Sequence, residues 1–109
     1  MQEVRVWLDD VRDPPGTGWI ICRTPQDFAT ILYDPDIQII CVSFDHDLGC
    51  VDSNTNEEIT GYTCARWLEK RLRSDSNYRI PDMRVHSMNP VGQKNIVHVI
   101  QRIKRLHTV

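Results

Sequence analysis

The fold is decided by one stretch of sequence, Ile39-Ile40-Cys41-Val42-Ser43-Phe44-Asp45-His46-Asp47-Leu48-Gly49. Its first half is an apolar run of strand length, which fits a β-strand that is buried on both faces, as in a parallel sheet. The run ends abruptly in two carboxylates and a histidine. Because open α/β sheets bind their ligands at the carboxyl ends of their strands, the stretch predicts a functional site where this strand ends.

The composition is that of a soluble globular protein with one domain. The chain has 109 residues, of which 26% are charged and 40% hydrophobic, enough for a core without metal or disulfide staples. The net charge of −2 predicts no general nucleic-acid-binding surface, so an anionic ligand needs local help from a metal, a helix end or a few cations.

The sequence shows no pattern of a membrane span, a signal peptide or a zinc site. No apolar stretch approaches the ~20 residues of a membrane span, and the N-terminus lacks a signal-peptide pattern. The four cysteines form no close-spaced pair, which argues against a zinc site and favours buried thiols in a reducing compartment. We therefore expect a cytoplasmic protein with no membrane partner.

The chain before the deciding stretch predicts two strands and a helix. Apolar residues alternate over 4–8, and a second apolar run covers 19–23; the loop between them is rich in Pro and Gly. Thr24-Pro25 is a typical helix start, a cap followed by Pro at the first helical position.

The chain after it predicts a long loop, two helices and one more strand. The polar segment 50–60 is expected to be a solvated loop, and 61–74 a helix whose basic outer face is interpreted as solvated surface. The run 83–88 is the fourth strand and its end, and Asn89-Pro90 starts the last helix.

This order of elements predicts a single α/β domain over residues 1–109. Strands separated by helices imply a three-layer sandwich around a four-stranded parallel sheet. Right-handed crossovers favour the strand order 2-1-3-4, a truncated flavodoxin-like or receiver-like arrangement.

In that order the strands ending at Leu8, Phe44 and Val85 are neighbours, so polar groups that follow them converge on one cleft. The candidates are Asp9, Asp10, Asp45, His46, Asp47, His86 and Ser87. Carboxylates this close repel one another unless a cation lies between them, and Mg²⁺ or Mn²⁺ with carboxylate and water ligands would remove the repulsion. The last helix would point free N–H groups at the cleft and form a phosphate site.

Each group also has a structural interpretation. Asp9-Asp10 could belong to a turn, and His46 could simply pair with a neighbouring carboxylate. Ser87 and Asn89 could be helix caps, and Arg12 could steady the carboxylates or face solvent. The coincidence of three strand ends with functional groups favours a site over these separate explanations.

The pattern resembles the receiver domain of response regulators. The receiver's acidic pair corresponds to Asp9 and Asp10, its acidic residue after the third strand to Asp45, and its hydroxyl residue to Ser87. The sequence shows no fifth strand and so no place for the receiver's lysine, and it adds His46 and His86. These departures argue against ordinary phosphorelay signalling.

Four motifs are similar to a narrower family, the cyclic-phosphate-processing receiver-like domain of bacteria and phages. They are Trp7-Leu8-Asp9-Asp10-Val11-Arg12-Asp13-Pro14, Ser43-Phe44-Asp45-His46-Asp47-Leu48-Gly49, Gly61-Tyr62 and His86-Ser87-Met88-Asn89-Pro90-Val91-Gly92. The resemblance covers essentially the whole chain. It implies action on a cyclic phosphate, such as the 2′,3′-cyclic end of an RNA or a cyclic nucleotide.

We therefore hypothesise a metal-dependent phosphoesterase for a cyclic phosphodiester. The expected metal ligands are Asp9, Asp10 and Asp45, with Asp47 as a further candidate, and the acid or base is His86 or His46. Phosphate or substrate contacts are expected from a separate set of residues: Arg12, Tyr62, Ser87, Asn89 and Lys94.

Three alternatives remain open at this stage. Asp45 could accept the phosphoryl group covalently, as the corresponding aspartate does in receiver domains. The domain could be a non-catalytic binding or signalling module that docks a partner or a nucleotide. The exposed edge of the 83–88 strand could pair two copies into a homodimer, unless Arg84 protects it.

Overall fold

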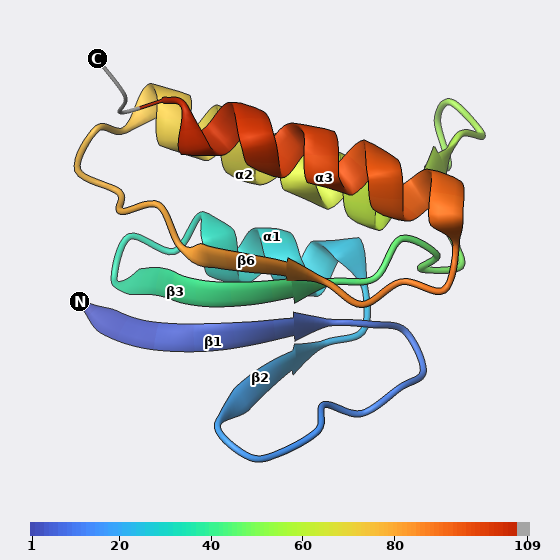
Figure 1. Cartoon of the computed structure of the whole chain (residues 1–109), viewed down its shortest axis with the longest axis horizontal. Coiled ribbons are helices and arrows are strands. Elements are labelled where there is room, and N and C mark those ends of the chain that lie inside the picture. The colour runs from blue at the N-terminus through green and yellow to red at the C-terminus, as the bar shows by residue number, and fades with distance from the viewer. Residues whose placement is uncertain (107–109) are drawn as a thin grey trace.

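The computed structural model describes residues 1–106 and contains a four-stranded sheet, a two-stranded sheet and three helices (Figure 1). The elements are β1 (Gln2–Leu8), β2 (Trp19–Cys22), α1 (Pro25–Leu32), β3 (Ile37–Phe44), β4 (Cys50–Val51), β5 (Glu58–Ile59), α2 (Gly61–Ser74), β6 (Asp82–Val85) and α3 (Pro90–Lys104). No helix in this range is long and apolar enough to cross a membrane.

The four-stranded sheet has the predicted composition and order. Its order is β2-β1-β3-β6, and every pair within it is parallel. Because β6 is the strand predicted over 83–88, this is the order 2-1-3-4, and the α/β fold class is confirmed. β6 lies at the sheet edge, as expected, and its Arg84 is exposed and pairs with Asp82.

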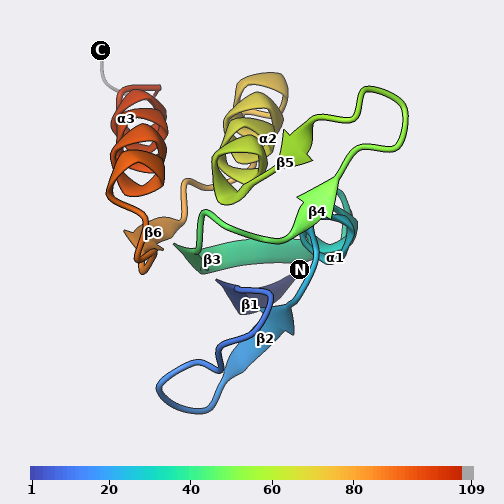
Figure 2. The same cartoon turned by 90° about the vertical axis from the view of Figure 1, so that its right-hand side faces the viewer.

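The expected third layer is absent from the described residues, because all three helices lie on one face of the sheet (Figures 1 and 2). α1 packs against α2 and α2 against α3. Both helical crossovers, β2–α1–β3 and β3–α2–β6, run in the same direction across the sheet, and right-handed crossovers in one direction place their helices on one face. The connection running the other way, from β1 to β2, is a loop.

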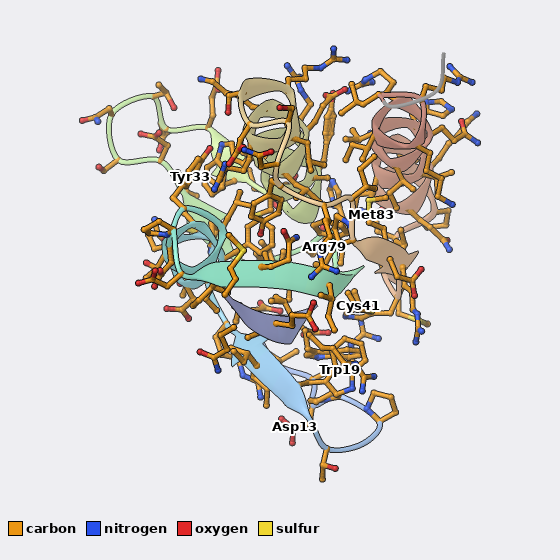
Figure 3. The ribbon with its side chains drawn as sticks, turned by 90° about the vertical axis from the view of Figure 1, so that its left-hand side faces the viewer. Asp13, Trp19, Tyr33, Cys41, Arg79 and Met83 are labelled. Carbon is orange, nitrogen blue, oxygen red and sulfur yellow. The ribbon has the colours of Figure 1, made fainter. Side chains whose placement is uncertain are left out.

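Large side chains cover the face that the helices leave open. The apolar core joins the helices to Val6, Leu8, Val42 and Phe44 on one side of the sheet. On the other side Trp7 contacts Trp19 edge to face, with 5.8 Å between ring centroids. Trp19 and Cys41 are visible there in Figure 3. β3 is therefore buried on both faces without a second helical layer.

Local signals explain the helix starts. Thr24 caps α1 by accepting a hydrogen bond from the N–H of Asp27, and Thr60 and Thr63 form a capping box at α2. Asn89 caps α3 through the N–H of Gly92. The segment expected to be only a loop contains the short antiparallel pair β4–β5. Its tip turns at Asn56, which adopts a positive φ of 57°.

Candidate active site at the carboxyl edge of the sheet

Backbone hydrogen bonds extend the sheet by one residue beyond the ends of β1, β3 and β6. They fix the first polar residue that follows each of these strands. The N–H of Asp9 donates to Cys22 O at 3.1 Å, that of Asp45 to Leu8 O at 2.9 Å, and that of His86 to Phe44 O at 3.0 Å. The three residues are consequently held side by side at the carboxyl edge of the sheet.

Three carboxylates meet at this edge. Asp9, Asp10 and Asp45 each offer one oxygen, and these oxygens lie within 4.8 Å of one another. Asp9 and Asp45 are buried, and Asp10 is half-buried. The structure thus brings together the three residues that the sequence analysis named as metal ligands.

Asp9 is held by four donors. Its Oδ1 accepts from the N–H groups of Val11 and Arg12 at 2.9 and 2.8 Å. Its Oδ2 lies 3.1 Å from Nε of Arg12 and 3.0 Å from Nε2 of His86. Burial by itself would raise the pKa of Asp9, but the hydrogen bonds from these groups outweigh it and hold the pKa below its usual range.

Asp45 is shifted in the opposite direction. Burial and the negative charge of Asp9 raise its pKa, although Arg12 Nη2 lies 3.5 Å from Oδ1 and the N–H of His46 donates to the same oxygen at 2.9 Å. Two adjacent carboxylates with opposite shifts are typical of sites that divide charge and proton between two groups.

His86 is engaged on both ring nitrogens. Nδ1 lies 2.7 Å from Oγ of Ser43, and Nε2 lies 3.0 Å from Asp9 Oδ2. Its ring stacks on Trp7, with 3.8 Å between centroids and 7° between planes. Burial lowers the pKa of His86, more than the nearby Asp9 raises it. This geometry suits a residue that orients Asp9.

His46 is held on one ring nitrogen only. Its Nδ1 lies 2.9 Å from Oδ1 of Asp47, and Asn89 Nδ2 donates to the same oxygen at 3.4 Å. The ring lies against Gly92 in the first turn of α3, where an added Cβ would come within 2.2 Å of Cγ of the ring. Nε2 has no hydrogen-bond partner among residues 1–106.

Asp47 lies outside the group of three carboxylates and pairs with His46. If strand alternation continued past Phe44, Asp45 and Asp47 would share one side, and His46 would lie on the other. β3 ends at Phe44, so the alternation does not persist. The pairing that the sequence analysis considered as a structural interpretation of His46 is therefore present.

The expected phosphate contacts divide into two groups. Arg12 lies among the carboxylates, and Ser87 and Asn89 lie between β6 and α3, where Ser87 Oγ accepts from the N–H of Asn89 at 3.1 Å. Lys94 is exposed on α3. Tyr62 lines a cavity on α2, and its hydroxyl accepts from Arg66 at 3.4 Å. The structure shows no contact of Lys94 or Tyr62 with the three carboxylates.

Three residues at this edge are not among the candidate site residues of the sequence analysis. Ser43 and Trp7 hold His86, and Trp7 also donates from Nε1 to Arg12 O at 3.0 Å. Arg23 braces the 9–13 loop through Asp9 O at 3.2 Å and Arg12 O at 2.6 Å. Ser43 carried a usable signal, because it is a hydroxyl two residues before Asp45 in an otherwise apolar run.

Comparison with known families gives one match. Residues 4–102 match the family described as the cyclic-phosphate processing receiver domain. The chain belongs to this family. No curated protein and no solved structure matches it. In this receiver domain the acidic residues that follow β1 and β3 lie at the sheet edge where open α/β sheets generally bind ligands.

Proposed function

We propose that this receiver domain is a metal-dependent phosphoesterase acting on a cyclic phosphodiester. The observation that supports it is the group of three carboxylate oxygens within 4.8 Å at the edge of a parallel sheet. The family description, which names cyclic-phosphate processing, supports the substrate class.

The three carboxylates fit a hard divalent cation. Asp9, Asp10 and Asp45 supply only oxygen ligands, the type preferred by Mg²⁺ and Mn²⁺. Burial and the negative charge of Asp9 raise the pKa of Asp45 even with Arg12 nearby, so a further cation beside these carboxylates would favour the ionised form of Asp45. When bound, such an ion would supply the charge that polarises a phosphate oxygen.

Arg12 connects the carboxylates to the phosphate side of the proposed site. Its guanidinium contacts both Asp9 and Asp45, and its side chain is 43% exposed. A cation among the carboxylates would weaken these contacts and leave the guanidinium to bind a phosphate group, often through two parallel N–H···O bonds. Ser87 and the positive end of α3, capped by Asn89, would bind further phosphate oxygens.

The two histidines receive different tasks in this proposal. His46 keeps Nε2 for the substrate while Asp47 fixes its Nδ1, which is the arrangement expected of a general acid or base. His86 uses both nitrogens inside the protein, so we assign it to positioning Asp9. Of the two histidines that the sequence analysis left open, we therefore assign proton transfer to His46.

The test is turnover of 2′,3′-cyclic AMP and of a cyclic dinucleotide with Mn²⁺. Asp45→Asn and His46→Ala should each lower kcat about 100-fold, and His86→Ala should mainly weaken the apparent Mn²⁺ affinity. Asp82→Asn, which changes an exposed carboxylate on β6, is the matched control and should keep wild-type rates. Equal, metal-independent turnover by all variants would refute the proposal.

A non-catalytic binding module is the second candidate, and the pairing of Arg12 with Asp9 and Asp45 favours it, because a guanidinium can balance these charges without a cation. Calorimetry with Mn²⁺ and a cyclic nucleotide, followed by recovery of the ligand, separates the candidates. Tight binding of a ligand that is recovered unchanged would favour the module.

A further inference from the structure

The charges of the domain are strongly segregated. α2 and α3 together carry seven Lys or Arg residues and a single acidic residue, Glu69, so their formal charge is +6. The whole chain has a net charge of −2, which leaves −8 for all other residues. A weakly acidic protein therefore presents a basic helical surface, a feature that the net charge alone concealed.

An arginine cluster on this surface surrounds one carboxylate. Glu69 accepts from Arg102 through Nε and Nη2, both at 3.0 Å, and from Arg73 Nη2 at 3.2 Å, while Arg66 Nε lies 4.0 Å away. Glu69 is buried, whereas the side chains of Arg66 and Arg73 are each 57% exposed. One carboxylate thus holds three guanidiniums in place and leaves an excess of exposed positive charge.

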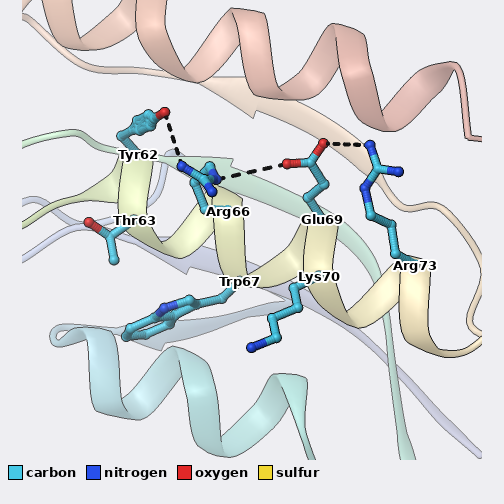
Figure 4. A pocket seen from close by; sticks show the side chains of 7 residues that line it. All are labelled: Tyr62, Thr63, Arg66, Trp67, Glu69, Lys70 and Arg73. Carbon is cyan, nitrogen blue, oxygen red and sulfur yellow. Dashed lines mark hydrogen bonds and ion pairs between the residues drawn. The ribbon is translucent and has the colours of Figure 1, made fainter.

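A cavity of about 510 Å³ adjoins this cluster along the outer side of α2. Its lining includes Tyr62, Arg66, Trp67, Glu69, Lys70 and Arg73. In Figure 4, Tyr62, Arg66 and Arg73 extend from the side of α2 nearer α3, and Trp67 and Lys70 extend toward α1. Aromatic rings beside guanidinium and ammonium groups are what single-stranded nucleic acids bind, through base stacking and phosphate contacts.

The basic surface starts at the candidate active site. The N–H of Gly61, the first residue of α2, donates to His46 O at 2.8 Å. From there the 14 residues of α2 extend about 21 Å away from the carboxylates. A free cyclic mononucleotide would not use a charged surface of this length, whereas a strand leaving the site would follow it.

We propose that α2, with Arg102 of α3, binds the phosphate backbone of a single-stranded RNA whose 3′ end enters the carboxylate site. This inference rests on the proposed function for the chemistry at that end. It selects an RNA terminus over a free cyclic nucleotide as the substrate class, and it assigns a ligand to the basic face of α2.

The experiment measures binding without turnover. Fluorescence anisotropy in EDTA follows a labelled RNA of about ten nucleotides that carries a 2′,3′-cyclic phosphate. The variant is Lys70→Gln with Arg73→Gln, both exposed. The matched control is Arg79→Gln with Arg84→Gln, which removes the same charge from exposed residues outside the helices.

We expect the Lys70/Arg73 variant to bind the RNA about tenfold more weakly, while the control binds like the wild type. The slope of log K against log salt concentration should become about 1.4 less steep in the variant, because two phosphate contacts are lost. Turnover of 2′,3′-cyclic AMP with Mn²⁺ should be unchanged in both. If wild type does not bind the RNA, or if variant and control bind it equally, the inference is wrong. If wild type turns over neither 2′,3′-cyclic AMP nor the cyclic dinucleotide but the variant still loses RNA binding, the proposed function is wrong and the proposed RNA-binding surface is supported.

Discussion

At the scale of single residues, the surroundings of a side chain decide its chemistry more than its type does. Asp9 and Asp45 are both buried carboxylates. The donors around Asp9 outweigh its burial and lower its pKa, whereas burial and the charge of Asp9 raise the pKa of Asp45. The same reasoning separates the histidines. His86 is enclosed by Trp7, Ser43 and Asp9, and His46 keeps one nitrogen for a ligand.

The cysteines give a prediction at this scale. Because the thiolate is the reactive form, burial that raises the pKa of Cys22 to about 12, and also raises the pKa of Cys41 and Cys64, should protect these thiols. Cys50 is half-buried on β4. Iodoacetamide at pH 8 followed by mass spectrometry should show Cys50 alkylated first and all four only after unfolding. Labelling of Cys22 as fast as Cys50 would contradict the burial.

The residues at strand ends were predictable because a change from apolar to acidic residues is visible in sequence. The residues that support them are harder to predict, although the hydroxyl of Ser43 stands out in its apolar run. In sequence, Ser43 and Trp7 otherwise look like ordinary members of their strands. Only the pairing of β3 with both β1 and β6 brings them onto His86. Tyr62 and Lys94 were expected at the site from sequence proximity to its helix starts, but the direction of a helical side chain depends on the packing of the helix.

At the scale of elements, two glycines allow α2 and α3 to approach the candidate site closely. A Cβ on Gly61 would lie 1.8 Å from Asp45 O, and one on Gly92 would lie 2.2 to 2.6 Å from three atoms of the His46 ring. The helices can therefore start directly against the Asp45–His46 segment only because these positions lack side chains.

Gly92→Ala gives the prediction at this scale. The added methyl group should displace the His46 ring and weaken its contact with Asp47. The preference of Ala over Gly in a helix, about 0.5–1 kcal/mol, offsets part of the cost of this displacement. Histidine NMR spectra should show shifted His46 resonances, and turnover in the assay above should fall.

Gly16→Ala is its control, because nothing lies within 4 Å of a Cβ at Gly16. It should leave both the His46 resonances and the activity unchanged. Unshifted His46 resonances in Gly92→Ala would contradict the proposed packing of the ring against α3.

The elements themselves show where sequence patterns suffice. Caps and prolines fixed the starts of α1 and α3, since these signals act locally. The pair β4–β5 was missed because two-residue strands carry no periodicity. The general association of parallel sheets with three layers predicts helices on both faces. The order of elements decides for a single helical layer here, because both helical crossovers run the same way across the sheet.

At the scale of the whole molecule, the carboxyl edge of the sheet gathers negative charge, and the two helices that start there carry positive charge along their length. Glu69 is the one acidic residue of these helices and joins α2 to α3 through Arg102. Removing its charge should therefore loosen the contact between the two helices. The basic surface would then lack the group that holds its arginines.

Acid titration tests this role of Glu69. Hydrogen bonds from Arg102 hold the pKa of Glu69 below its ordinary value of 4.5. For a carboxyl group with a lowered folded-state pKa, the stabilisation is complete above the unfolded-state pKa and is lost as the pH falls through the folded-state value. Glu69→Gln should therefore lower the free energy of unfolding by about 1–2 kcal/mol at neutral pH, and the difference from wild type should shrink as the pH falls below 4.5.

Urea unfolding followed by circular dichroism at neutral pH and at about pH 3 measures this difference. Glu58→Gln, on the exposed strand β5, is the matched control, and it should change the unfolding free energy by less than about 0.5 kcal/mol at either pH. If Glu69→Gln and wild type differ equally at both pH values, packing of the side chain rather than its charge joins the helices. In that case the charge of Glu69 would not be needed to position the arginines of the basic surface, and packing of the helices would hold them.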